Sequence, residues 1–363
     1  MGRLDDLLAA GPVLADGAMG STLMTLGLEL GAAPELWNVD FPDRVAGVHA
    51  AYAAAGARII LTNSFGASRW RLDRHGLTSR HAELNRAAVA VARRGAPEAL
   101  IAGDIGPSGL LLAPLGPLGA EEARAGFAEQ AQGLVDGGAD LIWIETMSDL
   151  AEVMAAVAGV REVSAGIPIV VTMTFDTKGR TMMGVRPEQA VEALAPLGVA
   201  ALGANCGNGP AEMLDVIGRM VATGTTLPLI AKANAGMPRL VDGHATYDAT
   251  PGAMAQYARD VRARGAHIIG ACCGSTAGHL AAMGKALCGV TPPRCVQAGC
   301  VHEGPQLPGH PQSPPRGSPP GRPSAGGIWD QSPPRGGPLP GSPTPPPPRP
   351  PPRRDRSPRP AIP

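Results

Sequence analysis

The feature that most constrains the fold is a regular alternation of short apolar runs with longer segments of helical periodicity. The apolar runs are eight in number and cover residues 13–16, 58–62, 100–104, 140–145, 168–175, 201–206, 228–234 and 266–273. The helical segments lie near residues 43–55, 79–95, 120–137, 149–164, 187–197, 210–222, 250–264 and 276–287. Strands that are covered by helices on both faces read as continuous apolar runs, as these do. Eight such units within residues 1–290 predict an α/β fold of the (β/α)8 (TIM) barrel class, with a doubly wound open sheet as the alternative.

Polar side chains stand at the ends of these runs. In a (β/α)8 barrel the reactive groups lie at the carboxyl ends of the strands, so the last polar residues of each run are candidates for a site. These candidates are Asp16, Thr62, Asn63, Asp104, Glu145, Asp176, Asn205, Cys206, Asn234, Cys272 and Cys273. Side chains of these types can bind a metal ion, an ammonium group or a carboxylate.

Cysteines end two of the predicted strands. Cys206 ends one, and the adjacent pair Cys272 and Cys273 ends the other. A single cysteine is more often a buried packing residue than a ligand. Neighbouring side chains on a regular strand face opposite ways, so packing gains nothing from an adjacent pair, whereas a bend at Gly270 and Gly274 would let both thiols reach one ion. The pattern therefore predicts a Zn²⁺ site of three thiolates with one open position, which is typical of a catalytic metal.

Charge and composition exclude several classes of function. Basic and acidic residues balance at 31 each over the chain, but residues 1–290 hold 22 basic and 28 acidic residues, so a nucleic-acid-binding surface is not expected there. The first six residues lack the basic start of a signal peptide, and no apolar run reaches the roughly 20 residues of a membrane span. We therefore expect a cytoplasmic protein without a membrane partner, in which cysteines are free thiols or metal ligands.

The composition changes abruptly after residue 287. Residues 291–363 hold 25 of the chain's 39 prolines and nine arginines. Such a segment cannot bury enough apolar surface to offset the entropy of ordering it. The predicted organisation is a barrel domain of residues 1–290 followed by a disordered Pro/Arg-rich tail of residues 291–363. A proline-rich ligand for an SH3-type partner is the alternative for the tail.

Four short motifs carry a resemblance to a known family. They are DGAMG at residues 16–20, TNSFG at 62–66, GANC at 203–206 and GACCG at 270–274. In this order, from about residue 10 to residue 287, the chain resembles the zinc-dependent homocysteine S-methyltransferase family. That family includes betaine-homocysteine methyltransferase and the homocysteine module of cobalamin-dependent methionine synthase. The resemblance implies a (β/α)8 barrel and an enzyme that moves a methyl group from a donor to the thiol of L-homocysteine, giving methionine.

The resemblance also implies roles for individual residues. Zinc would be held by Cys206, Cys272 and Cys273, and the homocysteine thiol would take the open position. Bound zinc would remove the proton of a thiol whose pKa is ordinarily near 8.5, and only the thiolate attacks a methyl carbon. Asp16 and Glu145 match acids that help bind homocysteine in the family, so we expect them to contact its ammonium group or to orient its sulfur.

Further polar residues and three aromatic rings complete the expected substrate pocket. Thr62 and Asn63 close the second run, and Asn234 is expected either near the metal or in a turn. Betaine, a trimethylammonium compound, would be held against aromatic faces. The rings available for this are Trp37, Phe65 and Trp143.

The methyl donor is expected to be betaine or a related compound, with two alternatives. The animal betaine-using enzymes carry tyrosines at the positions that match Gly66 and Thr146, so their donor cage is not reproduced here. A separate corrinoid protein, which would then be a partner, and S-methylmethionine are the other donors that the resemblance implies. A barrel that binds zinc or homocysteine without methyl transfer is the alternative from another class of function.

Overall fold

The computed structural model describes residues 2–237, 239–241 and 244–288. Eight parallel strands form a nearly closed barrel in the order β1-β10-β7-β6-β5-β4-β3-β2. A single bridge between Ala15 and Ile59 joins the two end strands. The strands are β1 (Val13–Leu14), β2 (Ile59–Leu61), β3 (Leu100–Ile105), β4 (Leu141–Met147), β5 (Ile169–Met173), β6 (Ala201–Cys206), β7 (Leu229–Ala233) and β10 (Ala266–Ala271). The predicted (β/α)8 barrel is therefore confirmed.

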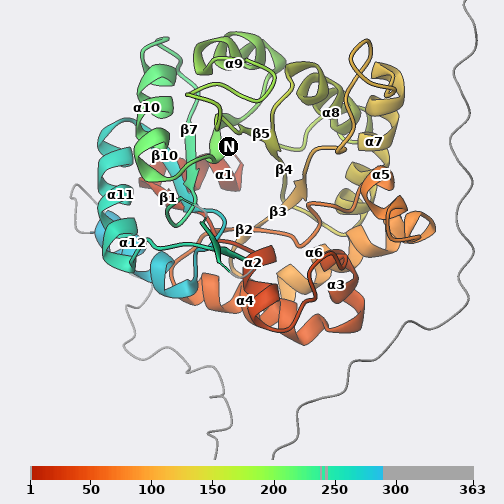
Figure 1. Ribbon diagram of the computed structural model, residues 1–363, viewed down its shortest axis with the longest axis horizontal. Coiled ribbons are helices and arrows are strands. Elements are labelled where there is room, and N and C mark those ends of the chain that lie inside the picture. The colour runs from red at the N-terminus through yellow and green to blue at the C-terminus, as the bar shows by residue number, and fades with distance from the viewer. Residues whose placement is uncertain (1, 238, 242–243, 289–363) are drawn as a thin grey trace, which may run out of the picture. The chain divides into compact units, whose positions relative to one another are not determined.

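Helices form the outer ring of the barrel (Figure 1). One follows each strand: α4 (Pro42–Ala54), α6 (His81–Gly95), α7 (Ala120–Asp136), α8 (Leu150–Val163), α9 (Pro187–Leu194), α10 (Pro210–Val221), α11 (Pro251–Ala263) and α12 (Ala277–Cys288). The short elements are α1 (Arg3–Ala10), α2 (Gly20–Thr25), η1 (Pro34–Leu36), α3 (Trp37–Asp40), α5 (Arg69–Asp73), η2 (Thr78–Arg80), η3 (Ala195–Leu197) and the antiparallel pair β8 (Arg239–Val241) and β9 (His244–Thr246). α11 begins with a Thr250 side chain that accepts a hydrogen bond from the Ala253 N–H, followed by Pro251.

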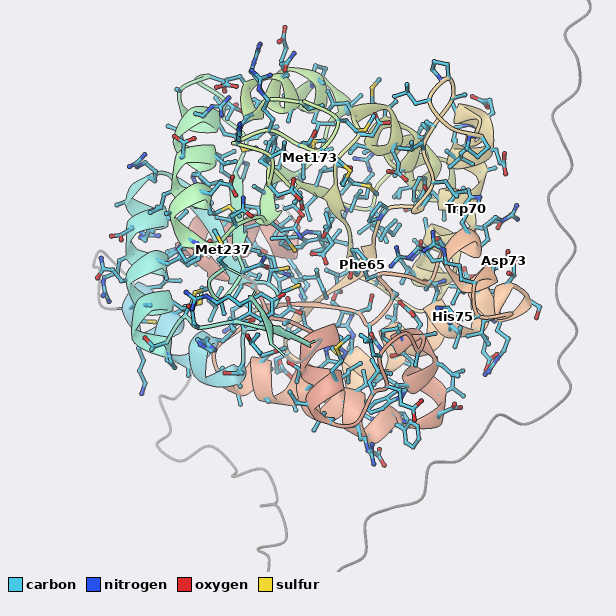
Figure 2. The ribbon with its side chains drawn as sticks, viewed as in Figure 1. Phe65, Trp70, Asp73, His75, Met173 and Met237 are labelled. Atoms are coloured by element: carbon cyan, nitrogen blue, oxygen red, sulfur yellow. The ribbon has the colours of Figure 1, made fainter. Side chains whose placement is uncertain are left out.

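Alternate residues along each strand face two separate apolar cores. Outward residues such as Ile60 and Ile142 pack against the helices, whereas inward residues such as Ile59 and Trp143 fill the barrel. Leu4 of α1 joins the inner core, so α1 covers the amino-terminal end of the barrel. Side chains fill the space inside and outside the strands (Figure 2). The opposite, carboxyl end is thereby left as the end at which a site can open.

The boundary expected near residue 290 and the tail of residues 291–363 lie outside the described residues. Among the described helices, none combines the length and the apolar character that a bilayer crossing requires.

Candidate metal and substrate site

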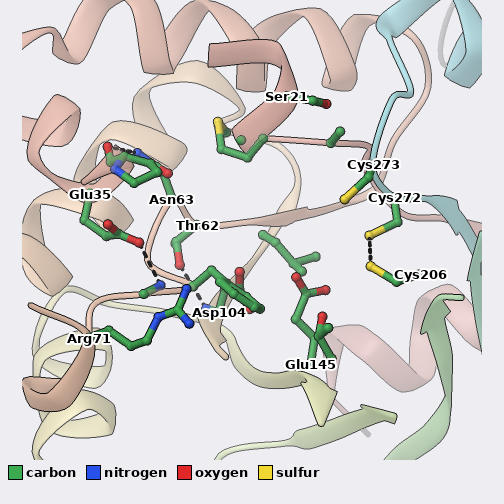
Figure 3. A pocket seen from close by; sticks show the side chains of 18 of the residues that line it. Ser21, Glu35, Thr62, Asn63, Arg71, Asp104, Glu145, Cys206, Cys272 and Cys273 are labelled. Atoms are coloured by element: carbon green, nitrogen blue, oxygen red, sulfur yellow. Dashed lines mark hydrogen bonds between the residues drawn. The ribbon is translucent and has the colours of Figure 1, made fainter. Parts of the chain in front are cut away.

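A cavity of about 480 Å³ opens at the carboxyl ends of the strands. Its lining comes from the segment after β1, from the residues that follow β2, and from the ends of β3, β4, β6, β7 and β10. Cysteines line one side of it, and Glu35 and Arg71 line the opposite side (Figure 3). The lining of the cavity therefore has sulfur atoms on one side and charged side chains on the other.

Cys206, Cys272 and Cys273 bring their sulfur atoms together on one wall. Cys206 is the last residue of β6, and the other two follow β10. The three Sγ atoms all lie within 4.8 Å of one another, and those of Cys206 and Cys272 are 2.9 Å apart. Hydrogen bonds from the other two thiols lower the pKa of Cys273 to about 3. One of the sulfurs is thus favoured as an anion.

The backbone is strained where Cys206 enters this cluster. Its φ of 59° lies in the left-handed region, which costs a non-glycine residue roughly 1–2 kcal/mol. Gly274, with a φ of 78°, turns the chain after Cys273, and a Cβ at this position would overlap the ring of Tyr247. Strain of this kind persists only where the surrounding structure holds it, and it is common at functional sites.

The three thiols suit a metal ion, and zinc in particular. In a tetrahedral site with Zn–S bonds of about 2.3 Å, the sulfurs lie about 3.8 Å apart. The Sγ atoms here, 2.9 Å apart in one pair and all within 4.8 Å, need only small shifts to reach that spacing. Three sulfur ligands leave one tetrahedral position for a further ligand from the cavity.

Asn205, on β6, supports the cysteine wall by hydrogen bonds that reach across β5 to the end of β4. Its amide forms two hydrogen bonds with Thr146, donating to Oγ1 at 2.7 Å and accepting from N–H at 2.9 Å. Thr146 lies where the register of β4 shifts, and its φ is 60°. The same Asn205 Nδ2 lies 3.6 Å from the Cys206 sulfur. The amide therefore fixes the end of β4 and donates toward a sulfur at the same time.

Lys232 places a cation on the floor of the cavity. It follows the inward Ile230 by two residues on β7, and its side chain is 3% exposed. Its Nζ lies 3.0 Å from Asp16 Oδ1 and 3.8 Å from Glu145 Oε2, and 5.1 Å from the centre of the Trp143 ring. Burial alone would lower the pKa of Lys232, but the two carboxylates more than offset this and raise it. The lysine is therefore charged.

Burial changes the acidity of three carboxyl groups around this lysine. It raises the pKa of Asp16, although Lys232 and the Leu61 N–H act in the opposite direction. It raises the pKa of Glu145 to about 7, again against the effect of Lys232. Burial, with the nearby Glu145, raises the pKa of Asp104 well above its usual range. At neutral pH this part of the cavity therefore holds at least one carboxyl group that is readily protonated.

Not all of the expected pocket residues line the cavity. Thr62, Asn63 and Phe65 do. Asn234 donates a hydrogen bond to the Gly207 carbonyl at 2.7 Å. It is not part of the lining formed by the described residues, and its role stays a prediction.

The two tryptophans expected to hold a donor lie away from the lining that the described residues form. Trp37 packs against Phe41 with ring centres 4.9 Å apart. Trp143 lies inside the barrel, where its Nε1 donates a hydrogen bond to Thr172 at 3.1 Å. Of the three rings, Phe65 is thus the one that faces the cavity.

Several charged residues of the lining were not predicted from the sequence, among them Lys232, Glu35 and Arg71. Lys232 had a signal, because it is the single charge in the apolar run of residues 228–234. Glu35, which accepts a hydrogen bond from the Gly66 N–H at 2.7 Å, lies outside every predicted strand and helix. Arg71, whose guanidinium lies 5.7 Å from the centre of the Phe65 ring, also lies between the predicted elements. No pattern in the sequence indicated these last two.

Comparisons with known proteins agree with this geometry. The profile of the family described as homocysteine S-methyltransferase matches residues 13–287. The methionine synthase of Mycobacterium tuberculosis is 33% identical over 306 residues, which are 79% of this chain and 26% of that protein. The methionine synthase of Mycobacterium leprae is 33% identical over 293 residues, 76% of this chain and 24% of that protein. The chain thus spans about a quarter of the length of these relatives.

One solved structure matches this chain over nearly the whole length of the solved protein. The homocysteine methyltransferase MmuM from Escherichia coli, in its metallated form, superposes with a TM-score of 0.66 at 26% sequence identity. The match covers 78% of this chain and 99% of that one. Because the family profile spans the whole described barrel and the cysteines lie inside the matched region, the chain belongs to the homocysteine S-methyltransferase family.

Proposed function

We propose that the protein is a zinc-dependent methyltransferase that moves a methyl group from a small donor to the thiol of L-homocysteine and so forms methionine. The observation that carries this proposal is the wall of three thiols within 4.8 Å of one another, placed in the same cavity as buried carboxyl groups. The thiols provide a metal site and the carboxyl groups a place for an ammonium group, which are the two ends of homocysteine. The metallated relative at 26% identity supports the metal.

The chain's own residues would do most of the work of binding and positioning. Cys206, Cys272 and Cys273 would hold the ion, and Asn205 would keep the end of β6 in place through its hydrogen bonds to Thr146. Zinc, when bound, supplies a Lewis acid that lowers the pKa of a substrate thiol from about 8.5. Glu145, buried beside Lys232, would face the amino-acid end of the substrate. In the transfer, the new S–CH₃ bond forms as the bond between the methyl group and the donor breaks.

Betaine or a related methylammonium compound is the donor we propose first. Phe65 faces the cavity and offers an aromatic surface to such a cation. Arg71 already lies near that ring, so the site would hold a single ring contact rather than an aromatic cage. S-methylmethionine and a methylated corrinoid protein are the alternatives.

A panel of labelled donors tests this proposal. We expect the zinc-loaded full chain to form methionine from homocysteine with isotopically methyl-labelled betaine, and mass spectrometry of the product to show the label. S-methylmethionine and a methyl-corrinoid protein serve as the other arms and identify the donor if betaine is inactive. If metal-loaded protein gives no methionine with any of the three, a barrel that carries or senses zinc or homocysteine becomes the better interpretation.

A further inference from the structure

Three basic residues belong to the lining of the cavity, namely Arg71, Arg74 and His75. Arg71 lies in the short helix α5, and the other two follow that helix directly. Figure 3 shows Arg71 on the side of the cavity opposite the cysteine wall. The metal site and the acids around Lys232 do not involve these residues, so this side of the cavity is free to bind another part of a substrate.

Arg71 has no anionic partner within the described residues. Its side chain is half-buried, and its guanidinium lies 5.7 Å from the centre of the Phe65 ring without forming an ion pair or a hydrogen bond there. Glu35 is the acid near it. Burial raises the pKa of Glu35, although Arg71 and His75 act in the opposite direction. The guanidinium of Arg71 therefore keeps its N–H donors for a ligand, beside a carboxyl group whose anion is disfavoured by burial.

The guanidinium of Arg74 comes close to that of Arg71. Both pack on Gly109, where a Cβ would lie 3.1 Å from Arg74 Nη2 and 3.4 Å from Arg71 Nη1. Arg74 Nη2 donates a hydrogen bond to the Gly109 carbonyl at 3.3 Å. The preceding Ser108 is fixed by its N–H, which donates to Glu152 at 2.8 Å. Arg74 has no ion pair in the described part of the chain either, so two like charges are held near one another, and an anion bound between them would remove their repulsion.

We propose that Arg71, with Arg74 beside it, binds the carboxylate of the methyl donor and so selects donors that carry a carboxylate in addition to the methylated cation. The inference rests on the proposed function, because it concerns the donor of that reaction. A guanidinium can bind a carboxylate through two parallel hydrogen bonds, which fixes the direction of the ligand as well as holding it. Betaine has a carboxylate at one end and a trimethylammonium group at the other.

The distribution of charge in the cavity suits a donor of this kind. Its methylated cation has to reach the cysteine wall, and the acids Asp104 and Glu145 line the same cavity. Lys232, the cation on the floor, is engaged by Asp16 at 3.0 Å and by Glu145 at 3.8 Å. The carboxylate of the donor would then point away from the cysteine wall, toward Arg71 (Figure 3). A donor without an anionic group would leave both guanidinium groups unpaired.

Betaine and choline test this inference, because they share the trimethylammonium group and only betaine has a carboxylate. Calorimetry of each with the zinc-loaded full chain, without homocysteine so that no methyl group is transferred, gives a ratio of affinities. In Arg71→Met we expect betaine to bind about tenfold or more weakly and choline to bind no more weakly than in the wild type. Arg71→Lys keeps the charge but loses the paired hydrogen bonds, so its ratio should fall between the two. It decides the matter if Arg71→Met does not fold.

Arg86→Met is the matched control, since Arg86 is exposed on α6 and outside the lining that the described residues form. We expect this variant to keep the wild-type ratio. Turnover provides a second measurement, in which Arg71→Met should raise the KM for betaine about tenfold and leave the KM for homocysteine unchanged.

Three results would overturn the inference. They are a wild-type chain that does not bind betaine more tightly than choline, an Arg71→Met variant that keeps the wild-type ratio, and a rise in the KM for homocysteine in place of that for betaine. The last result would mean that the guanidinium holds the amino acid. The proposed function fails separately, when no donor yields methionine, and it stands if betaine yields methionine while the ratio does not depend on Arg71.

Discussion

Cys272→Ala is expected to lose its zinc and, with it, the formation of methionine. The Cys272 sulfur lies 2.9 Å from that of Cys206 and belongs to the cluster of three within 4.8 Å, so its removal leaves only two sulfur ligands. Loss of a supporting residue around a metal typically costs 10–100-fold in affinity, and loss of a ligand should exceed about 100-fold. Zinc content after dialysis and the rate of methionine formation are the measurements.

Cys288→Ala is the matched control for this experiment. Cys288 is exposed at the end of α12, outside the cluster of three sulfurs. We expect this variant to retain about one zinc per chain and its full rate. If Cys272→Ala also kept its zinc and its turnover, the metal would have to lie elsewhere.

Lys232→Met is expected to lower the free energy of unfolding by about 3–5 kcal/mol, because it leaves Asp16 buried without its cation. Methionine has a similar length and can pack over Trp143, so lost volume should contribute little. The decrease in the free energy of unfolding should be smaller at acidic pH, because Asp16 becomes protonated there and no longer needs a counter-charge. Denaturant titration at neutral and acidic pH measures both effects.

Two further variants test whether the loss of stability comes from breaking this ion pair or from removing a lysine in general. Lys285→Met, on the exposed side of α12, is expected to change stability by no more than about 0.5 kcal/mol. Asp16→Asn/Lys232→Met should recover much of the loss, because no unpaired charge remains. Lys232→Met with wild-type stability would mean that Asp16 does not depend on this lysine.

The sequence alone predicted most of the barrel because its strands are buried on both faces. Runs such as residues 100–104 and 201–206 are apolar and end in polar groups, and the structure has β3 and β6 at these places. Local patterns in the sequence did not indicate α1, which covers the amino-terminal end of the barrel through Leu4, or the pair β8 and β9. Both are short elements whose formation depends on contacts distant in the sequence, and local periodicity does not report such contacts.

The sequence predicted the part of the candidate site that is formed by unusual residues, the three cysteines. It did not predict the part that depends on which buried charged side chains lie next to one another. Three cysteines at strand ends are rare enough to indicate a metal, and the structure brings their sulfurs within 4.8 Å. The sequence could not show that Asp16 is paired with Lys232 while Asp104 is left without a hydrogen-bond partner among the described residues. That distinction depends on which inward positions of different strands lie at the same height in the barrel.

The central claim is that Cys206, Cys272 and Cys273 hold one zinc ion and that the thiol of homocysteine adds to it. Zinc K-edge X-ray absorption on the full chain, with and without homocysteine, tests this most directly. We expect three zinc–sulfur distances of about 2.3 Å in the protein alone and a fourth sulfur when homocysteine is present. A shell made mainly of nitrogen and oxygen, or a number of sulfurs that homocysteine does not change, would contradict the claim.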